Sequence, residues 1–484
     1  MRRAPPSADG SGTAGATCPR SWRRSVGGRV VAARVCRPWD GANRHRAGAA
    51  RHIPSRRPRP ASMLAAMNAT PSALPRTGSP LGTPRLTELD WLRVIAFALL
   101  ILYHAGMFYV SWDWHVKSPR LIPALEAWML WLNPWRMSLL FVISGAATAL
   151  MAERAARPGR LIATRSQRLL LPLLFGMAVI VPPQSYLEVV EKAHYGGSYL
   201  EFLKLYFQAY RGFCRGSDCL VLPTWNHLWF LPYLWTYTVL VLLGLMLPDA
   251  RRMFTHPAWG RLVAGGRLLW VPWLVFALLR QHLLTRFPTT HDLLHDVYQH
   301  GVYGVMFLLG FALFGSRDDR HGAWEAARRW RWAALLGYVV VQLLSEATTS
   351  AWRQAHGDDF PDALLMALRA LNAGKQWLPI VAVMGFGRQW LADRDSPMLR
   401  WLTLAVFPFY LVHQTVTVIA GHLLAPLHWP LALEAFTLVA VTALGCLLAA
   451  LVAMRVNALR PWMGLGPKAA PESKKPGTLR YRAF

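Results

Sequence analysis

Long apolar segments recur along most of this 484-residue chain, and they constrain its fold more than any other feature. A helix needs about 20 apolar residues to cross the roughly 30 Å hydrocarbon core of a bilayer. Hydrophobic residues make up 54% of the chain and charged residues only 16%, a balance typical of membrane proteins. The sequence therefore predicts an all-α integral membrane protein with about ten transmembrane helices in one bundle. The predicted segments are 89–110, 123–150, 169–190, 225–247, 268–287, 297–316, 332–350, 362–388, 400–424 and 431–454.

Lys and Arg are distributed unevenly between the connections that join these segments. One alternate set carries 24 of them and the other carries 8. Because cytoplasmic loops of membrane proteins are rich in Lys and Arg, the basic set and both termini are predicted to be cytoplasmic. The basic set is 153–168, 249–267, 317–331, 388–400 and the tail from Arg455, and the other set is 111–122, 191–224, 281–296, 351–361 and 425–430.

The chain divides by composition into three parts. Residues 1–84 are rich in Arg, Pro, Gly, Ala and Ser without apolar periodicity, so they are predicted to be disordered. They contain no apolar stretch of the signal-peptide type, and Met63 and Met67 are plausible alternative starts. Residues 85–455 form the membrane domain, and 456–484 a basic cytoplasmic tail. These loops and the Arg-rich N-terminal part account for the net charge of +28 without a nucleic-acid partner.

Two ionisable residues, Arg93 and His104, interrupt the first apolar segment. At about 100° and 1.5 Å per residue, they share one helix face and lie about 16 Å apart along the axis. Such a side chain costs about 2.5–3.5 kcal/mol at membrane depth, so it tends to mark a functional pathway. The alternative is that Arg93 reaches the cytoplasmic surface and His104 makes one interhelical hydrogen bond.

Three further polar residues lie in apolar segments. Arg136, in the outer half of the second segment, needs Glu126, Glu188 or an anionic ligand as a partner. His227 lies near the start of the fourth segment, among aromatic residues. An interfacial aromatic belt explains the aromatic residues but not the histidine. For His413, near the middle of the ninth segment, a site-lining role and a structural hydrogen bond are both open.

The connection before the third apolar segment contains the basic element RSQR. Its Arg165 and Arg168 are three residues apart and enter the third helix on one face. Guanidinium groups at a cytoplasmic helix start suit bidentate phosphate binding. The alternative is that they are ordinary charges of a cytoplasmic loop.

Small residues and cysteines indicate packing rather than chemistry. The run Ser144–Ala147 predicts close approach between membrane helices. Cys214 and Cys219 form either a disulfide on the oxidising side of the membrane or two free thiols. Cys446 is predicted to be a core residue.

No metal site is expected. The pair His291 and His295 has a spacing that metal ligands use, but no third ligand accompanies it in the sequence. Cys18 and Cys36 lack the second pair or the histidines of a zinc site.

Taken together, these motifs resemble the acyltransferase-3 superfamily of integral membrane acyltransferases over about residues 85–455. The family signature of an Arg and a His separated by ten residues is matched by Arg93 and His104, and its RxxR element by Arg165 and Arg168. The runs FVISG, HLWFL and PFYLVHQ also resemble family landmarks. SWDWHV and WRMSLLFVISG look most like the periplasmic glucan succinyltransferases, the glucan biosynthesis protein C branch.

The resemblance implies transfer of an acetyl or succinyl group from cytoplasmic acyl-CoA to a hydroxyl of an extracytoplasmic carbohydrate, such as a periplasmic glucan, at a bacterial inner membrane. Histidine suits a general base at neutral pH, and we favour that role for His104 over a covalent acyl-histidine. For a succinyl group, Arg136, Arg369 or Lys375 would accept the free carboxylate. The implied roles are catalysis for His104 and Arg93, donor binding for Arg165 and Arg168, and substrate binding for Arg136, His227 and His413.

Two other classes of function compete with this one. A transporter or flippase for a glycan or lipid-linked sugar would use the same intramembrane residues to line a path. A non-catalytic scaffold would leave His104 and His413 unexplained. A chemically modified product distinguishes the enzyme from both, and the sequence leaves homo-oligomerisation open.

Overall fold

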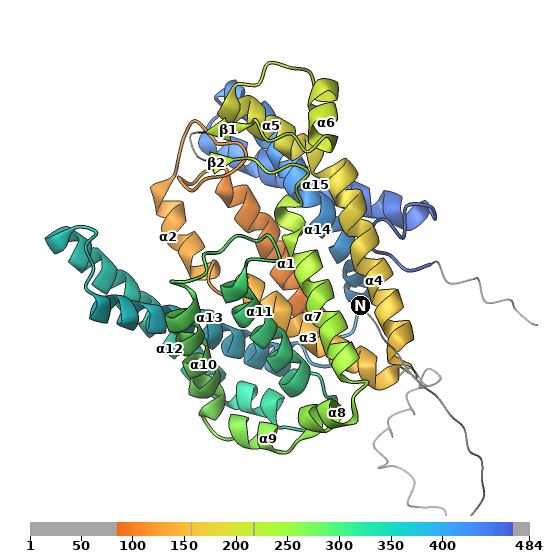
Figure 1. Cartoon of the computed structure of the whole chain (residues 1–484), viewed down its shortest axis with the longest axis vertical. Coiled ribbons are helices and arrows are strands. Elements are labelled where there is room, and N and C mark those ends of the chain that lie inside the picture. Colours follow the sequence, from red (N-terminus) through yellow and green to blue (C-terminus); the bar gives the residue numbers. More distant parts are fainter. Residues whose placement is uncertain (1–84, 156, 216–217, 468–484) are drawn as a thin grey trace, which may run out of the picture. The chain divides into compact units, whose positions relative to one another are not determined.

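The computed structural model describes residues 85–155, 157–215 and 218–467, which are predominantly helical (Figure 1). The predictions for residues 1–84, including Cys18, Cys36, Met63 and Met67, lie outside the described residues. The elements in chain order are α1 (Thr87–Met107), α2 (Pro123–Leu132), α3 (Arg136–Arg154), α4 (Pro158–Phe175), the π-helical turn η1 (Gly176–Ile180), α5 (Pro182–Ala193), α6 (Tyr199–Phe207), β1 (Cys214–Arg215), β2 (Asp218–Cys219), the 3-10 turn η2 (Asn226–Trp229), α7 (Phe230–Gly244), α8 (Pro248–Thr255), α9 (Ala258–Val263), α10 (Arg267–Leu283), α11 (Val297–Leu309), the π-helical turn η3 (Gly310–Phe314), α12 (Ala323–His356), α13 (Asp362–Trp390), α14 (Pro397–Leu424), the 3-10 turn η4 (Ala425–Leu427) and α15 (Leu431–Arg455).

All ten predicted segments coincide with helical elements, which confirms the all-α membrane architecture. Among the described residues, 6 helices are long and apolar enough to cross a membrane, or up to 8 if each of two bent pairs forms one span. Charged residues shorten the apolar stretches of α12 and α13: Arg331 and Glu346 leave only residues 332–345 between them in α12. The count of ten spans therefore stays a prediction.

Proline sets the start of several helices, because its fixed φ suits the first turn and its missing N–H is not needed there. It opens α2, α4, α5, α8 and α14. Pro158 starts α4 eleven residues before the apolar segment that begins at residue 169. The prediction that Arg165 and Arg168 lie at a helix start is therefore wrong, since they are about two and about three turns inside α4.

Helices α3 and α11 approach each other at glycines. A Cβ on Gly145 of α3 would lie 2.0 Å from the Phe307 carbonyl oxygen of α11, and one on Gly310 would lie 2.0 Å from the Val142 carbonyl oxygen. No side chain fits in either gap, so the predicted packing role of Ser144–Ala147 is confirmed at Gly145.

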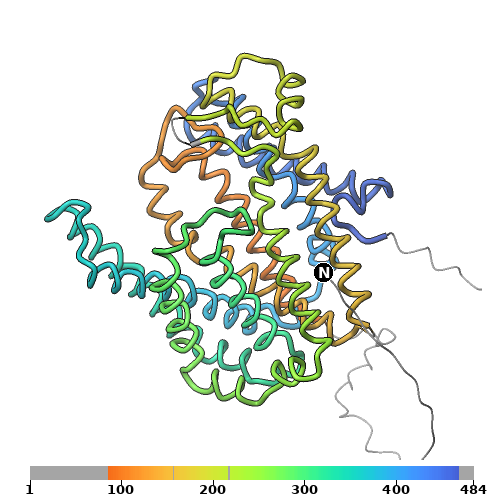
Figure 2. The backbone as a smooth tube through the Cα atoms, viewed as in Figure 1, coloured from red at the N-terminus to blue at the C-terminus, as the bar shows by residue number. Residues whose placement is uncertain are grey.

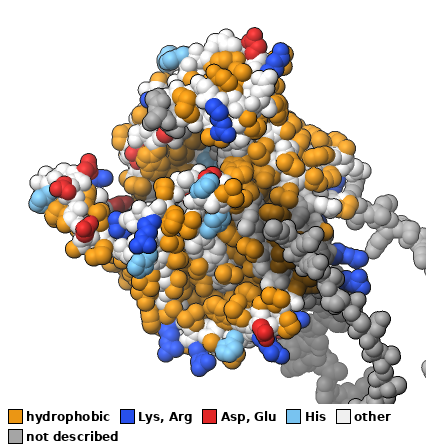
Figure 3. Space-filling view, viewed as in Figure 1, with side chains coloured by type: hydrophobic (Ala, Val, Ile, Leu, Met, Phe, Trp, Pro, Cys, Tyr) orange, Lys and Arg blue, Asp and Glu red, His pale blue; other side chains and the backbone are white. Residues whose placement is uncertain are grey.

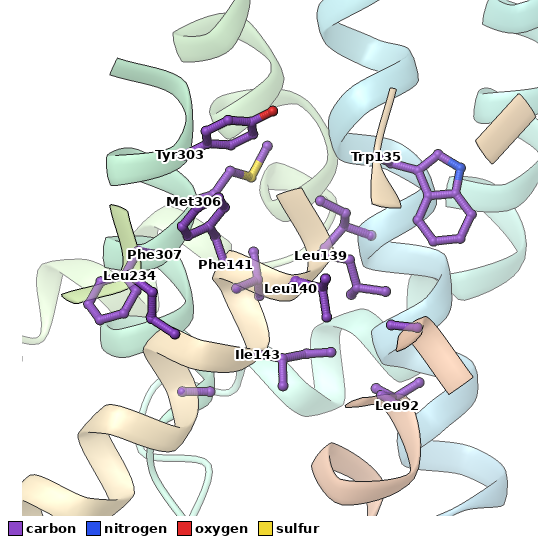
Figure 4. Close-up of a cluster of buried hydrophobic side chains, with 14 of the residues drawn as sticks. Leu92, Trp135, Leu139, Leu140, Phe141, Ile143, Leu234, Tyr303, Met306 and Phe307 are labelled. Atoms are coloured by element: carbon purple, nitrogen blue, oxygen red, sulfur yellow. The ribbon is translucent and has the colours of Figure 1, made fainter. Parts of the chain in front are cut away.

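The buried core continues outward from this crossing (Figure 4). The ring of Phe141 on α3 lies 4.6 Å from that of Tyr303 on α11 and 4.7 Å from that of Phe230 on α7. Leu139 and Ile143 of the same helix are also buried, and α1 packs against both α3 and α14. This core fixes the positions of the helices that carry the polar residues.

Most connections gather at two ends of the described bundle, whereas the connection between α12 and α13, residues 357–361, projects to one side (Figures 1 and 2). We call one the hairpin end, because it contains α5, α6, β1 and β2; there Lys192 pairs with Asp113 and the Trp225 indole donates to the His291 carbonyl. The opposite end, which contains α8 and α9, we call the arginine end. The hairpin end comprises 108–122, 186–224, 288–296 and 425–430, and the arginine end 85–93, 153–168, 245–267, 315–331, 388–400 and 455–467.

Side-chain chemistry differs between the two ends and the surface between them. Hydrophobic side chains cover much of the face in Figure 3, as expected for helices that meet lipid. Lys and Arg gather along the edge beside α8 and α9. At this end Arg320 pairs with Glu153, joining two connections of the basic set.

The two cysteines of the hairpin are bonded to each other. Cys214 and Cys219 form a disulfide and are also paired residues of the antiparallel strands β1 and β2. Of the two alternatives for these cysteines, the structure has the bridge. Cys446 is a buried free thiol on α15, as predicted.

Candidate active site

Helix α1 places Arg93 and His104 near its two ends. Arg93 lies in the second turn, where its guanidinium is 3.6 Å from the Asp90 carboxylate. His104 lies in the last turn, toward the hairpin end, and is only partly buried. The two signature residues therefore belong to different polar environments.

His104 and His413 form the centre of the site. Nδ1 of His104 is 2.7 Å from Nε2 of His413, and the rings are stacked with centroids 4.9 Å apart. Nδ1 of His413 is 2.8 Å from the Tyr410 carbonyl oxygen, which can only accept a hydrogen bond. Neutral His413 thus donates from Nδ1 and accepts at Nε2, so His104 must donate from Nδ1. This leaves Nε2 of a neutral His104 as a free proton acceptor.

His227 lies beside this pair, and hydrogen bonds fix its orientation. Its ring centroid is 5.1 Å from that of His413. Its Nε2 donates to the Leu411 carbonyl oxygen at 3.0 Å, while the Tyr410 hydroxyl donates to the His227 carbonyl at 2.8 Å. Its Nδ1 is 3.5 Å from the Gln184 amide nitrogen. These contacts tie η2 to α14 beside His413.

A polar network that the sequence reasoning missed extends from this cluster toward the hairpin end. Gln414, which follows His413, donates from Nε2 to Nε2 of His115 at 2.8 Å. Nδ1 of His115 in turn donates to Glu188 at 2.6 Å, and Lys192 donates to the other Glu188 oxygen at 2.9 Å. His115 was overlooked because it lies in the predicted loop 111–122, although the SWDWHV motif contains it.

Arg136 lies on the His104 side of the core, but its predicted carboxylate partners are engaged elsewhere. Its guanidinium carbon is 3.6 Å from the centroid of the Tyr103 ring, and Nη1 donates to Asn133 at 2.7 Å. Glu126 accepts from the Ser111 backbone instead. Because Glu188 likewise pairs with His115 and Lys192, neither glutamate is the partner of Arg136, and the third alternative, an anionic ligand, stays a prediction.

The cation next to His104 is Arg136 rather than the other two named for a succinyl carboxylate. Arg136 lies close enough to His104 for its positive charge to interact with the imidazole. Lys375 instead donates to Ser345 between α12 and α13. Arg369 lies on α13, about two turns before Lys375.

Arginines cluster at the opposite end of α1. Arg93 and Arg168 lie close enough to Arg165 for their positive charges to interact with its guanidinium. Nε of Arg165 is buried without a hydrogen-bond partner among the described residues. Arg168 is exposed, and its Nη2 lies against Gly466, whose carbonyl accepts from Arg460. The structure thus brings the first-helix arginine and the RSQR element together.

A cavity of about 330 Å³ opens at the arginine end between α3, α4, α7, α8 and η3. Its wall includes Leu161, which lies one turn before Arg165 on the same face of α4. Arg251, Arg320 and His321 also line it, among mainly apolar side chains. The cavity therefore combines a mainly apolar wall with two arginines, of which Arg320 pairs with Glu153, another lining residue.

The two histidines with metal-like spacing point to different partners. His295 donates from Nδ1 to Asp292 at 2.7 Å, while the His291 ring packs 4.5 Å from Trp229. Over 85–155, 157–215 and 218–467, no group of three or more His, Cys, Asp or Glu side chains could hold a metal ion.

Comparison with known proteins assigns the chain to a family. The acyltransferase-3 model, described as an acyltransferase domain, matches residues 86–454. Relatives named Glucans biosynthesis protein C from Salmonella paratyphi B, Salmonella enteritidis and Salmonella gallinarum are each 24% identical over 359 residues, covering 71% of this chain and 85% of the relative. No solved structure matches it. Because the family model spans most of the chain and the helices are those of a multi-pass membrane protein, the chain belongs to the acyltransferase-3 family and is a membrane O-acyltransferase.

Proposed function

We propose that this enzyme transfers an acetyl or succinyl group from cytoplasmic acyl-CoA to a hydroxyl of an extracytoplasmic carbohydrate, such as a periplasmic glucan, in a bacterial inner membrane. The hydrogen-bonded pair of His104 and His413 carries the proposal, because it leaves one imidazole nitrogen available as a base. The names of the relatives favour a glucan as acceptor.

Orientation follows from charge and from the disulfide. The basic connections gather at the arginine end, which we place in the cytoplasm together with both termini. The Cys214–Cys219 bridge belongs to the hairpin end and suits an oxidising compartment. With ten spans, as the sequence predicts, both termini lie on the same side.

In the proposed chemical step, Nε2 of His104 accepts one proton and then gives it up again. This nitrogen removes the proton of the acceptor hydroxyl as its oxygen attacks the thioester carbonyl carbon. Collapse of the tetrahedral intermediate breaks the carbon–sulfur bond, and the CoA thiolate takes the proton from His104. His413 accepts a hydrogen bond from Nδ1 throughout and so stabilises the imidazolium that forms between these events.

Donor binding is assigned to the arginine end. Arg165 and Arg168 would contact the phosphates of acyl-CoA, and Arg93 would complete the cation cluster. The cavity next to Leu161 would receive part of the donor. A donor held there would extend along α1 from Arg93 toward His104.

Arg136 is the residue that we assign to the acyl group. Its place over Tyr103, without a carboxylate partner among the described residues, suits the free carboxylate of a succinyl donor. A screen of acetyl-CoA against succinyl-CoA in membranes tests this assignment. Use of acetyl-CoA alone would contradict it.

A defined reaction tests the proposed function as a whole. Purified enzyme in lipid vesicles is supplied with acyl-CoA and a glucose oligosaccharide, and both CoA release and product mass are measured. We expect one acyl group added to the oligosaccharide for each CoA released. A transporter would leave the oligosaccharide mass unchanged, and that result would favour the alternative of a glycan or lipid-linked sugar flippase.

A further inference from the structure

A second pocket, of about 470 Å³, lies at the hairpin end and has no role in the chemistry described above. Three parts of the chain form its walls: the loop with Asp113, the last turns of α5 with Glu188 and Lys192, and the segment 213–215 with 219–221. The fold therefore brings together wall segments that are spread over about 100 positions of the sequence, from Asp113 to Val221.

The outer wall is a fixed structure. The Cys214–Cys219 disulfide closes the β1–β2 hairpin. Phe213, next to the bridge, packs 5.3 Å from the Tyr195 ring and 5.9 Å from the buried Phe202 ring of α6. The hairpin is thus anchored at its base by Phe213 and by the Cys214–Cys219 bridge.

The pocket presents paired charges in reach of solvent. Lys192 donates to Glu188 and to Asp113, both at 2.9 Å. The side chains of Glu188, Lys192 and Asp113 are 16%, 20% and 73% exposed. With Arg215, the lining carries two acids and two bases, so it has no net formal charge.

This lining matches the chemistry of a neutral sugar. Carboxylate oxygens accept hydrogen bonds from sugar hydroxyls, and the ammonium group donates to sugar oxygens. Phe213, Val189 and Val221 offer apolar surface for the C–H face of a ring. A strongly anionic ligand would be repelled by Asp113 and Glu188. A strongly cationic ligand would be repelled by Lys192 and Arg215.

Hydrogen bonds link the wall of the pocket to Gln414, the residue that follows His413 in α14. Glu188 accepts from His115, and His115 accepts from Gln414. An oligosaccharide in this pocket would extend past His115 and Gln414 to bring a hydroxyl to His104.

We propose that this pocket holds the neutral carbohydrate that receives the acyl group, and that the Cys214–Cys219 bridge fixes its outer wall. This inference rests on the proposed function, because it assigns an acceptor site to the same reaction. Lys192 holds both carboxylates in place, so it is the side chain on which sugar binding depends most.

The test separates binding from catalysis. A neutral glucose oligosaccharide is titrated into the full-length enzyme in vesicles, first by calorimetry without acyl-CoA and then as acceptor in the transfer assay. The variants are Lys192→Ala and Cys214→Ser with Cys219→Ser, and the control is Lys204→Ala, an exposed lysine on α6 outside the pocket. A uronate oligosaccharide of equal length serves as the charged competitor.

We expect Lys192→Ala to raise both the Kd and the acceptor KM about tenfold, the cysteine variant to raise them about threefold, and the donor KM to stay at the wild-type value. Lys204→Ala should match wild type in every measurement. Unchanged oligosaccharide Kd in Lys192→Ala, or tighter binding of the uronate, would overturn the pocket assignment. Oligosaccharide binding that depends on Lys192 without any acylated product would instead reject the proposed reaction and retain the pocket.

Discussion

The polar residues at the two ends of α1 differ in whether their hydrogen-bonding groups have partners in the protein. At the hairpin end, His104, His413, His115 and Glu188 are hydrogen-bonded to protein groups. At the arginine end, Arg93 is 3.6 Å from Asp90, and Arg165 keeps a buried nitrogen without a partner among the described residues. The first end is organised before substrate arrives, as proton transfer requires. In the proposed function, an anion completes the second.

Removing the free imidazole nitrogen should have the largest effect. His104→Ala should lower kcat by about 10²- to 10⁴-fold, the usual contribution of a general base. The measurement is CoA release and oligosaccharide acylation at saturating substrates, with insertion checked by membrane fractionation. Near-normal acylation by an inserted His104→Ala protein would refute the assigned role.

Removing charge from the arginine end should act on donor binding instead. Arg165→Ala with Arg168→Ala should raise the KM for acyl-CoA about 100-fold, since each charge-assisted hydrogen bond contributes about 1.5–3 kcal/mol. The effect should weaken at high salt, where exposed charges are screened. Arg252→Ala, an exposed arginine at the same end, is the matched control. If the double variant keeps the wild-type KM for acyl-CoA and only the orientation of the protein in the membrane changes, the two residues are ordinary loop charges.

The partner of His104 should matter less than His104 itself. His413→Ala removes the acceptor for Nδ1 of His104 and should lower kcat about tenfold, which corresponds to one hydrogen bond to a charged group. His413→Gln places an amide oxygen within reach of that proton and should recover part of the loss. A purely structural His413 would give equal losses in both variants, together with reduced thermal stability.

The smallest effect concerns stability at the hairpin end. Burial lowers the pKa of Lys117 to about 8, and its ammonium donates to the Met107 and Trp112 carbonyls. Between pH 8 and the unfolded value of 10.5, the unfolded chain binds a proton that the folded chain releases, so Lys117 makes stability rise with pH in this window. Tm measured in detergent from pH 7.5 to 10 should rise less in Lys117→Met than in wild type. Parallel Tm curves for the two proteins would contradict this.

Much of the fold could be predicted from one sequence because the membrane imposes it. Every segment long enough and apolar enough to cross a bilayer must satisfy its backbone internally, so helices at 89–110 or 431–454 follow from composition alone. Charged helices are harder: α12 and α13 carry arginines, a lysine and glutamates within their length, so apolar content alone does not decide whether they span. The start of α4 at Pro158 was missed because an amphipathic extension into water carries no apolar signal.

Sequence by itself determined the helical class, the residues worth examining and the uneven charge of the two sets of connections, since these depend on local composition. Only the tertiary structure decided that His104 meets His413 across 309 positions, that Glu188 pairs with His115 rather than Arg136, and that Arg93 joins the RSQR element. Partners of this kind are set by which helix faces pack together. That choice depends on close contacts such as Gly145 against Phe307, which no local pattern specifies.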